Sequence, residues 1–258
     1  MKRNFFYLLV AGYMGVLCHC KSSAEQPELT EEMDVWSTFN YPQVDFTNED
    51  VEGKGAGYAT YIPNPEQMIK ETALRVCQQL YFSPSEAPNV EKIVYRVHDY
   101  DGISGKGGEP PLIHVSFSSD YLDKQIKAGA SKETIIDEVV GVLVHEMTHA
   151  YQQSCKYEGD GWSVIEGIAD AVRYREGFID LSLRQPGGSW ADGYKTTGFF
   201  IAWITEHKDS NFLYQLNQSV GQDYHWTWEP NMQKLLGVSV ESVWEEYQSY
   251  LKTLEDQN

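Results

Sequence analysis

The segment that constrains this chain most is an apolar run, residues 139–144, that leads directly into two histidines four positions apart. On an α-helix, His145 and His149 leave the same face one turn apart, so both imidazoles can reach one metal ion. Glu146 lies beside them, and its carboxylate can take a proton from water without binding the metal. A buried helix needs a reason to carry three titratable groups. The segment therefore predicts a metal site rather than three ordinary residues on a helix surface.

A zinc site that does chemistry needs a third protein ligand and one position for water. A third histidine shortly after the pair is absent, because Cys155 stands at that place. Glu166 follows His149 after sixteen intervening residues, enough for a loop and an antiparallel second helix. Glu166 would then bind zinc, and Asp170, one turn further, would accept a hydrogen bond from the far nitrogen of a zinc-bound histidine.

Two other interpretations of these acidic residues stay open. Ser163 and Glu166 fit a capping box, in which Glu166 only bonds back to the start of its own helix. Alternatively, Asp170 is the ligand and Glu166 supports it. The small residues Gly167 and Ala169 would let the two helices approach closely.

The first residues predict export. A basic start precedes an apolar run over residues 5–17, which is typical of a secretory signal and shorter than the roughly 20 residues of a membrane span. Cys18 or Cys20, directly after the run, indicates a lipoprotein signal, whereas Ala24 fits ordinary cleavage. We favour a lipoprotein signal over residues 1–20. The expected location is the cell envelope, lipid-anchored or periplasmic, or the exterior.

The remaining chain is acidic. The leader holds two of the 20 basic residues and none of the 38 acidic ones, so the net charge of −18 becomes −20. Such a field repels phosphate backbones and argues against nucleic acid as a partner.

Residues 21–45 are polar and predict a tether. A catalytic domain is expected over residues 46–258, with lobes of about 46–153 and 154–258. Cys77 and Cys155 are too few for a disulfide framework, and a free thiol and a bridge both stay open.

The pattern along the chain predicts an α+β domain, with an N-terminal helix and a small sheet before the active-site helix and a mainly helical C-terminal part. The first helix begins at Asn64 and Pro65. Alternating β-branched residues predict strands over residues 90–97 and 113–117, joined by a loop. Further helices are expected over residues 133–153, 163–175, 193–208, 212–220 and 240–254. In the loop, Asp99 and Asp101 could contact a cation, although turn chemistry explains them as well.

Several segments resemble a known family. HEMTHAYQ (145–152) and IEGIAD (165–170) are similar to the basic secretory protein family of plants, whose bacterial members are grouped with it as peptidases. EGIA within the second segment is also similar to the ligand segment of gluzincin-type HExxH metallopeptidases. The resemblance extends over about residues 45–255, through DYDGI (99–103), IHVSFSSDYL (113–122), WADGYKTTGF (190–199), FLYQLN (212–217) and LLGVSVESVWEEY (235–247).

The resemblance implies a zincin-like fold, secretion and peptidase activity. It implies roles for six residues, namely the ligands His145, His149 and Glu166, the supporting Asp170, the general base Glu146, and Tyr194. Tyr194 would polarise a carbonyl oxygen or hold substrate, and core packing is the plainer alternative. The acidity of this chain departs from the family's name, so a basic surface is not expected.

The sequence therefore predicts an exported zinc metallopeptidase that hydrolyses peptides or proteins by zinc-activated water, with Glu146 as general base and acid. Two other classes stay open: a non-proteolytic zinc amidase, and a zinc-stabilised surface binding protein without turnover. If the strand at residues 113–117 forms the cleft edge, it would bind extended peptide by strand addition. His114 on its polar face could then line the cleft, but a surface position for this histidine is the favoured interpretation. The only membrane attachment expected is the N-terminal lipid. The oligomeric state cannot be predicted.

Overall fold

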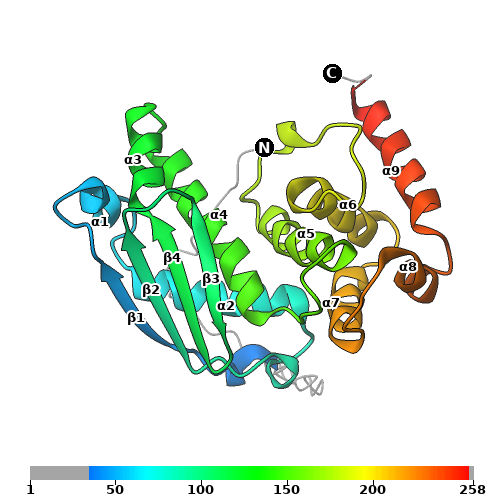
Figure 1. The fold of residues 1–258 in the computed structure, drawn as a ribbon, viewed down its shortest axis with the longest axis horizontal. Coiled ribbons are helices and arrows are strands. Elements are labelled where there is room, and N and C mark those ends of the chain that lie inside the picture. The colour runs from blue at the N-terminus through cyan, green and yellow to red at the C-terminus, as the bar shows by residue number, and fades with distance from the viewer. Residues whose placement is uncertain (1–34, 256–258) are drawn as a thin grey trace, which may run out of the picture. The chain divides into compact units, whose positions relative to one another are not determined.

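The computed structural model describes residues 35–255, so the predicted signal and most of the tether lie outside the described residues. The described chain is α+β and mostly helical, as predicted, with a four-stranded sheet before the helical C-terminal part (Figure 1). Among the described helices, none combines the length and the apolar character that crossing a bilayer requires. The elements are β1 (Gln43–Asn48), α1 (Tyr58–Tyr61), α2 (Pro65–Leu80), β2 (Lys92–His98), β3 (Ser104–Glu109), β4 (Leu112–Ser118), α3 (Ser119–Lys127), α4 (Lys132–Tyr151), α5 (Asp160–Arg175), α6 (Tyr194–His207), α7 (Phe212–Gln222), α8 (Trp228–Leu236) and α9 (Val240–Glu255), with four short 3-10 turns, η1 (Val35–Thr38), η2 (Lys54–Gly57), η3 (Pro84–Glu86) and η4 (Leu181–Leu183).

The folded part begins earlier than the predicted boundary at residue 46. Phe39 is buried against the ring of Tyr151 at 6.5 Å between centroids, and β1 pairs in parallel with β2 from Gln43 onward. Residues 35–45 therefore belong to the fold and not to a tether. The prediction grouped them with the polar residues before them, although they include Trp36, Phe39 and Tyr41.

The sheet order is β1-β2-β4-β3, with β3 antiparallel to β4 and the other pairs parallel. The two predicted strands are confirmed as β2 and β4. The loop predicted between them is wrong in part, because Ser104–Glu109 pairs with β4 although it is rich in glycine. The strand at residues 113–117 does not form the edge of the sheet, because β4 lies between β2 and β3. His114 is exposed and is not among the residues that line the cleft, so the favoured interpretation of a surface histidine is confirmed.

One face of the sheet is buried. In β2 and β4, alternate residues are buried, and α2 and α4 cover that face (Figure 1). Ser131 caps the start of α4 by accepting a hydrogen bond from the Thr134 amide at 3.1 Å. The apolar run before the two histidines is buried, as predicted, so α4 is held firmly between the sheet and the C-terminal helices. Cys77 and Cys155 are both free.

Helix α5 lies very close to α6. A Cβ added at Gly198 would lie 2.8 Å from the Asp170 Cβ, and one at Gly167 would lie 2.4 Å from the Thr197 Cγ2. Gly167 thus permits the approach of α6, and not that of α4 as predicted. Against α4, the close approach is at Gly141, where a Cβ would meet the Arg173 Nε at 2.9 Å. Helix α9 buries one apolar stripe, made of Val240, Val243, Trp244, Tyr247 and Leu251.

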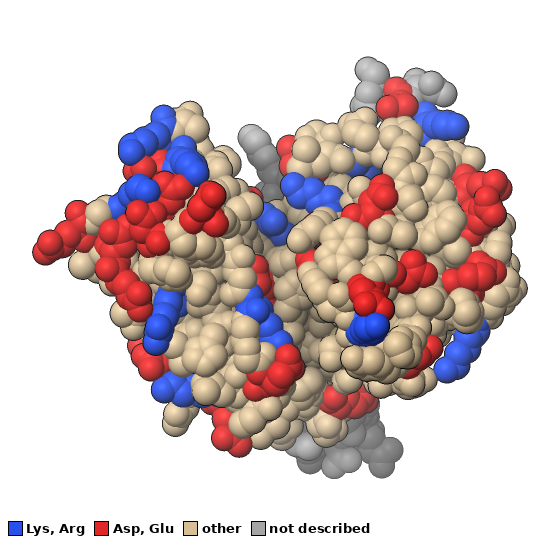
Figure 2. Space-filling model, in the orientation of Figure 1, with Lys and Arg blue, Asp and Glu red and all other residues tan. Residues whose placement is uncertain are grey.

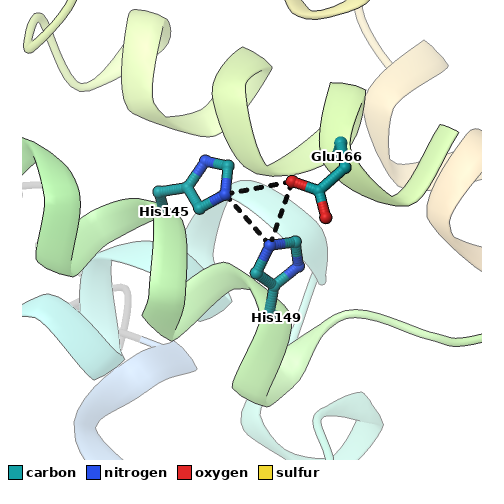
Figure 3. A group of neighbouring side chains, drawn as sticks. All are labelled: His145, His149 and Glu166. Atoms are coloured by element: carbon teal, nitrogen blue, oxygen red, sulfur yellow. Dashed lines mark hydrogen bonds and ion pairs between the residues drawn. The ribbon is translucent and has the colours of Figure 1, made fainter. Parts of the chain in front are cut away.

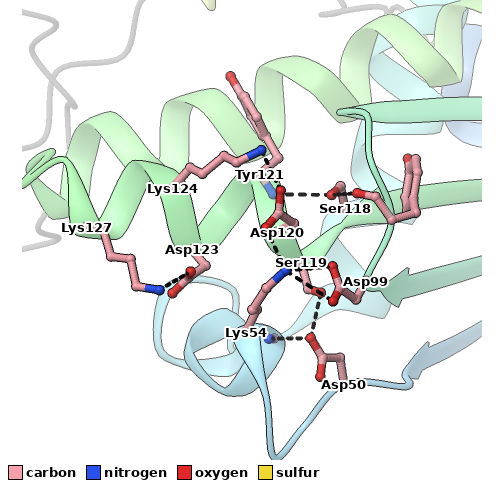
Figure 4. A network of polar contacts seen from close by, with 12 residues as sticks. Asp50, Lys54, Asp99, Ser118, Ser119, Asp120, Tyr121, Asp123, Lys124 and Lys127 are labelled. Carbon is pink, nitrogen blue, oxygen red and sulfur yellow. Dashed lines mark hydrogen bonds and ion pairs between the residues drawn. The ribbon is translucent and has the colours of Figure 1, made fainter.

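The turn after β2 contains the two acidic residues that could contact a cation. The Asp99 carboxylate contacts the Lys54 ammonium at 3.0 Å, and the same ammonium contacts Asp120 at 2.7 Å (Figure 4). Hydrogen bonds from Lys124 and Lys54 lower the pKa of Asp120 to about 2. The cation beside Asp99 is therefore a lysine of the chain itself, and the network ties η2 and α3 to the end of β2.

Candidate functional site

The structure brings His145, His149 and Glu166 together (Figure 3). The two Nε2 atoms are 3.0 Å apart, and Glu166 Oε2 lies 3.3 Å from the first and 3.5 Å from the second. Ligand atoms bound to one tetrahedral zinc ion at 2.0–2.2 Å lie about 3.3–3.6 Å from one another. Two imidazoles and one carboxylate are also the donors of many catalytic zinc sites. Both distances to Glu166 are in this range and the distance between the two histidines is slightly shorter, so these residues could hold a zinc ion.

Two antiparallel helices position the three side chains. His145 and His149 are one turn apart near the end of α4, whose buried apolar run fixes the helix. Glu166 lies in α5, and its side chain is only 5% exposed. Burial raises the pKa of Glu166, but hydrogen bonds from both histidines outweigh it and bring the pKa well below the usual range. The carboxylate is therefore charged and available as a ligand.

The capping-box interpretation is wrong. Helix α5 begins at Asp160, three residues before Ser163. The Ser163 hydroxyl donates to the Asp160 carbonyl at 2.9 Å and accepts a hydrogen bond from the Trp228 indole at 2.8 Å. Glu166 contacts the histidines instead of the start of its own helix.

Asp170 lies in the supporting position. Its Oδ1 atom is 2.8 Å from His145 Nδ1, the ring nitrogen that points away from the cluster. Burial lowers the pKa of His145, but hydrogen bonds to Asp170 and Glu166 outweigh burial and raise the pKa to about 9. The interpretation in which Asp170 is the ligand does not fit this geometry, because His145 stands between Asp170 and the cluster.

Glu146 lies beside the cluster without joining it. Its side chain is buried, and the residue lines the same cleft as the two histidines. Burial raises its pKa, whereas the charges of His145 and His149 lower it, and the pKa stays above the ordinary value. A carboxylate in this position can hold a proton while a reaction proceeds in the cleft.

Tyr194 is not a core residue, so the plainer alternative fails. It is 49% exposed, and its ring lies parallel to that of His145 at 6.0 Å between centroids. Its φ of 43° is the only positive φ of a non-glycine residue in the described chain. This conformation costs about 1–2 kcal/mol, and such residues concentrate at functional sites. The structure thus places Tyr194 beside His145, among the residues that line the cleft.

Replacing Tyr194 by phenylalanine tests its predicted role. If its hydroxyl donates to the substrate carbonyl in the transition state, Tyr194→Phe should lower kcat by about 10²-fold, with KM and zinc content unchanged. Tyr224→Phe is the matched control, because Tyr224 is exposed and does not line the cleft. Steady-state kinetics on a peptide substrate measures the effect. Wild-type kcat in Tyr194→Phe would assign Tyr194 to another role.

The cluster lies in a cleft of about 1160 Å³. Its wall includes residues of β3, α4 and α5 and the segment 192–196, and Figure 2 shows the surface hollowed between the side with the sheet and the helical side. Strand β3 pairs only with β4 in the described chain, so its other edge is open. A Cβ added at Gly105 or Gly107 would meet nothing within 4 Å, so the face of the sheet is open at these two glycines.

Sequence reasoning missed two residues at the site. The Tyr157 hydroxyl donates a short hydrogen bond to Glu166 Oε1, which leaves Oε2 facing the histidines. The Gln152 amide lies 3.0 Å from His149 Nδ1. The three-residue spacing from His149 could have indicated Gln152, since i and i+3 share a helix face. Tyr157 lies in the loop between α4 and α5, where no periodicity indicates a contact.

Comparison with known sequences agrees with these observations. A family described as peptidases of plants and bacteria, BSP, matches residues 41–247, which include every residue of the site described above. No curated protein and no solved structure matches the chain. The family match covers most of the chain and confirms the resemblance to the basic secretory proteins. The chain therefore belongs to the BSP family, the peptidases of plants and bacteria.

Proposed function

We propose that this protein is an exported zinc metallopeptidase with a zincin-like fold. The observation that carries the proposal is the group of His145, His149 and Glu166, whose ligand atoms lie within 4.8 Å of one another beside Glu146 in a cleft. Membership in a peptidase family supports the reaction class. The leader and its cysteines support export and a lipid anchor or release, and the substrate is a peptide or protein.

His145, His149 and Glu166 would hold the zinc ion. When bound, zinc acts as a Lewis acid and lowers the pKa of water from 15.7 to about 7. Glu146 accepts the proton of the attacking water on its carboxylate and later delivers it to the leaving amine. Tyr194 donates its phenolic hydrogen to the substrate carbonyl oxygen as negative charge develops there.

The open edge of β3 would bind the substrate backbone. Exposed strand edges bind extended peptides through main-chain hydrogen bonds. The residues Ser104, Gly105, Lys106 and Glu109 line the cleft and support this assignment. The edge strand thus takes the role that the sequence had suggested for residues 113–117.

The direct test combines metal analysis with a cleavage assay on a diverse peptide library. We expect about one zinc ion per purified chain, cleavage that stops when a chelator removes the metal, and cleavage that returns with added zinc. A chain that binds no zinc, or cleavage that a chelator does not affect, would contradict the proposal. Bound zinc without cleavage of any peptide would favour a binding protein instead.

A further inference from the structure

We infer that the side-chain amide of Gln152 orients His149 for metal binding by presenting its oxygen to the imidazole. This inference rests on the proposed metal centre. The amide nitrogen of Gln152 lies 3.0 Å from His149 Nδ1, and the amide oxygen is buried without a hydrogen-bond partner. A buried carbonyl oxygen without a hydrogen-bond partner destabilises the folded protein, which calls for an explanation.

The chemistry of a metal-bound imidazole supplies the explanation. His149 faces the cluster with Nε2, so a metal would take the lone pair of that nitrogen. A neutral imidazole then carries its only hydrogen on Nδ1, and this N–H needs an acceptor. The amide nitrogen of Gln152 can only donate. When it donates to Nδ1, a neutral His149 carries its hydrogen on Nε2, and that nitrogen cannot bind a metal. A half-turn of the amide exchanges its two ends and gives an Nδ1–H···O bond over the same distance.

The backbone holds Gln152 where this contact can form. Gln152 directly follows the last residue of α4, and its backbone N–H donates to the Thr148 carbonyl at 2.7 Å. The residue is three positions after His149 and only 8% exposed. The side chain is therefore confined next to the imidazole and has little freedom except rotation of its amide group.

The other two residues of the cluster have partners of the same kind. Asp170 accepts the hydrogen of His145 Nδ1, and Tyr157 donates to the Glu166 oxygen that faces away from the cluster. In each case the partner hydrogen-bonds to one polar atom of the ligand side chain and leaves the other polar atom free to bind metal. Gln152 completes this set for His149, and loss of such a partner typically weakens metal binding 10- to 100-fold.

Two substitutions test whether Gln152 acts as a hydrogen-bond acceptor or only fills space. Gln152→Leu keeps the volume and removes the acceptor, so its zinc Kd should rise 10- to 100-fold. Gln152→Glu keeps an acceptor and removes the donor, so its zinc Kd should equal or fall below that of the wild type. Gln233→Leu, on the exposed face of α8, is the control. Competition with a chelating dye measures each Kd.

Wild-type affinity in Gln152→Leu, or equal weakening in Gln152→Glu and Gln152→Leu, would overturn the inference. If the wild type itself binds no zinc, the metal centre fails, which is a different result. Nitrogen-15 spectra of the histidine side chains in the zinc-loaded wild type give a readout that needs no variant to fold. They should show the Nδ1 hydrogen of His149 exchanging slowly with water, as a hydrogen bond to the Gln152 oxygen requires, and rapid exchange would overturn the inference.

Discussion

Glu146→Gln is expected to retain zinc and to lower kcat for peptide cleavage by about 10²- to 10⁴-fold, the usual contribution of general acid–base catalysis. Glutamine has nearly the same shape as glutamate and fills the same buried place, but it cannot take a proton from water. The cluster of His145, His149 and Glu166 does not include this side chain, so metal binding should survive. Metal analysis and steady-state kinetics on one peptide substrate measure the two properties separately.

The control for this substitution is Glu133→Gln, which changes an exposed glutamate in the first turn of the same helix. It should leave both zinc content and kcat unchanged. If Glu146→Gln cleaves peptides at the wild-type rate, another group accepts the proton, and the proposed chemistry is wrong.

The second large effect is expected for Glu166→Ala, which removes one of three ligands. With free zinc at about 1,000 times Kd, binding stabilises the wild type by about 4 kcal/mol. For a chain of this length, 1 kcal/mol corresponds to a shift in Tm of about 2–4 °C. Zinc should therefore raise the Tm of the wild type by roughly 8–16 °C. It should leave that of Glu166→Ala nearly unchanged.

Asp170→Ala is the matched comparison, because Asp170 lies one turn along the same helix and contacts His145 from outside the cluster. Zinc should stabilise Asp170→Ala by about 1.4–2.7 kcal/mol less than the wild type, which is equivalent to a 10- to 100-fold loss of affinity. Its zinc-dependent shift in Tm should be smaller in proportion. A larger loss in Asp170→Ala than in Glu166→Ala would exchange the roles of the two residues.

The helical part of the site was predictable from the sequence because it is local. A four-residue spacing fixes the relation of His145 to His149, and a second four-residue spacing fixes that of Glu166 to Asp170. The apolar run before the histidines predicts burial of α4. The meeting of the two helices needed only a loop of suitable length, and the family resemblance supported it.

The sheet was less predictable because strand pairing is not local. Strand β3 has three glycines among six residues and no β-branched side chain, so its composition favours a loop. Its hydrogen bonds with β4 make it a strand, and the pattern of its residues does not predict these bonds. The same holds for Tyr157, whose contact with Glu166 depends on the path of a loop. The start of the fold was missed because residues 35–45 follow a polar stretch and show no periodicity, although aromatic contacts such as that of Phe39 join them to the core.

The glycines of β3 bear on which bonds the proposed enzyme would choose. Three of the six residues of this strand have no side chain, so its edge would bind an extended segment mainly through the main chain, with little dependence on sequence and a weakly specified register. Selectivity would then have to come from other residues that line the cleft, such as Tyr157 and Tyr194. Substituting these two tyrosines, while the strand is left unchanged, is therefore the natural route to a changed cleavage specificity.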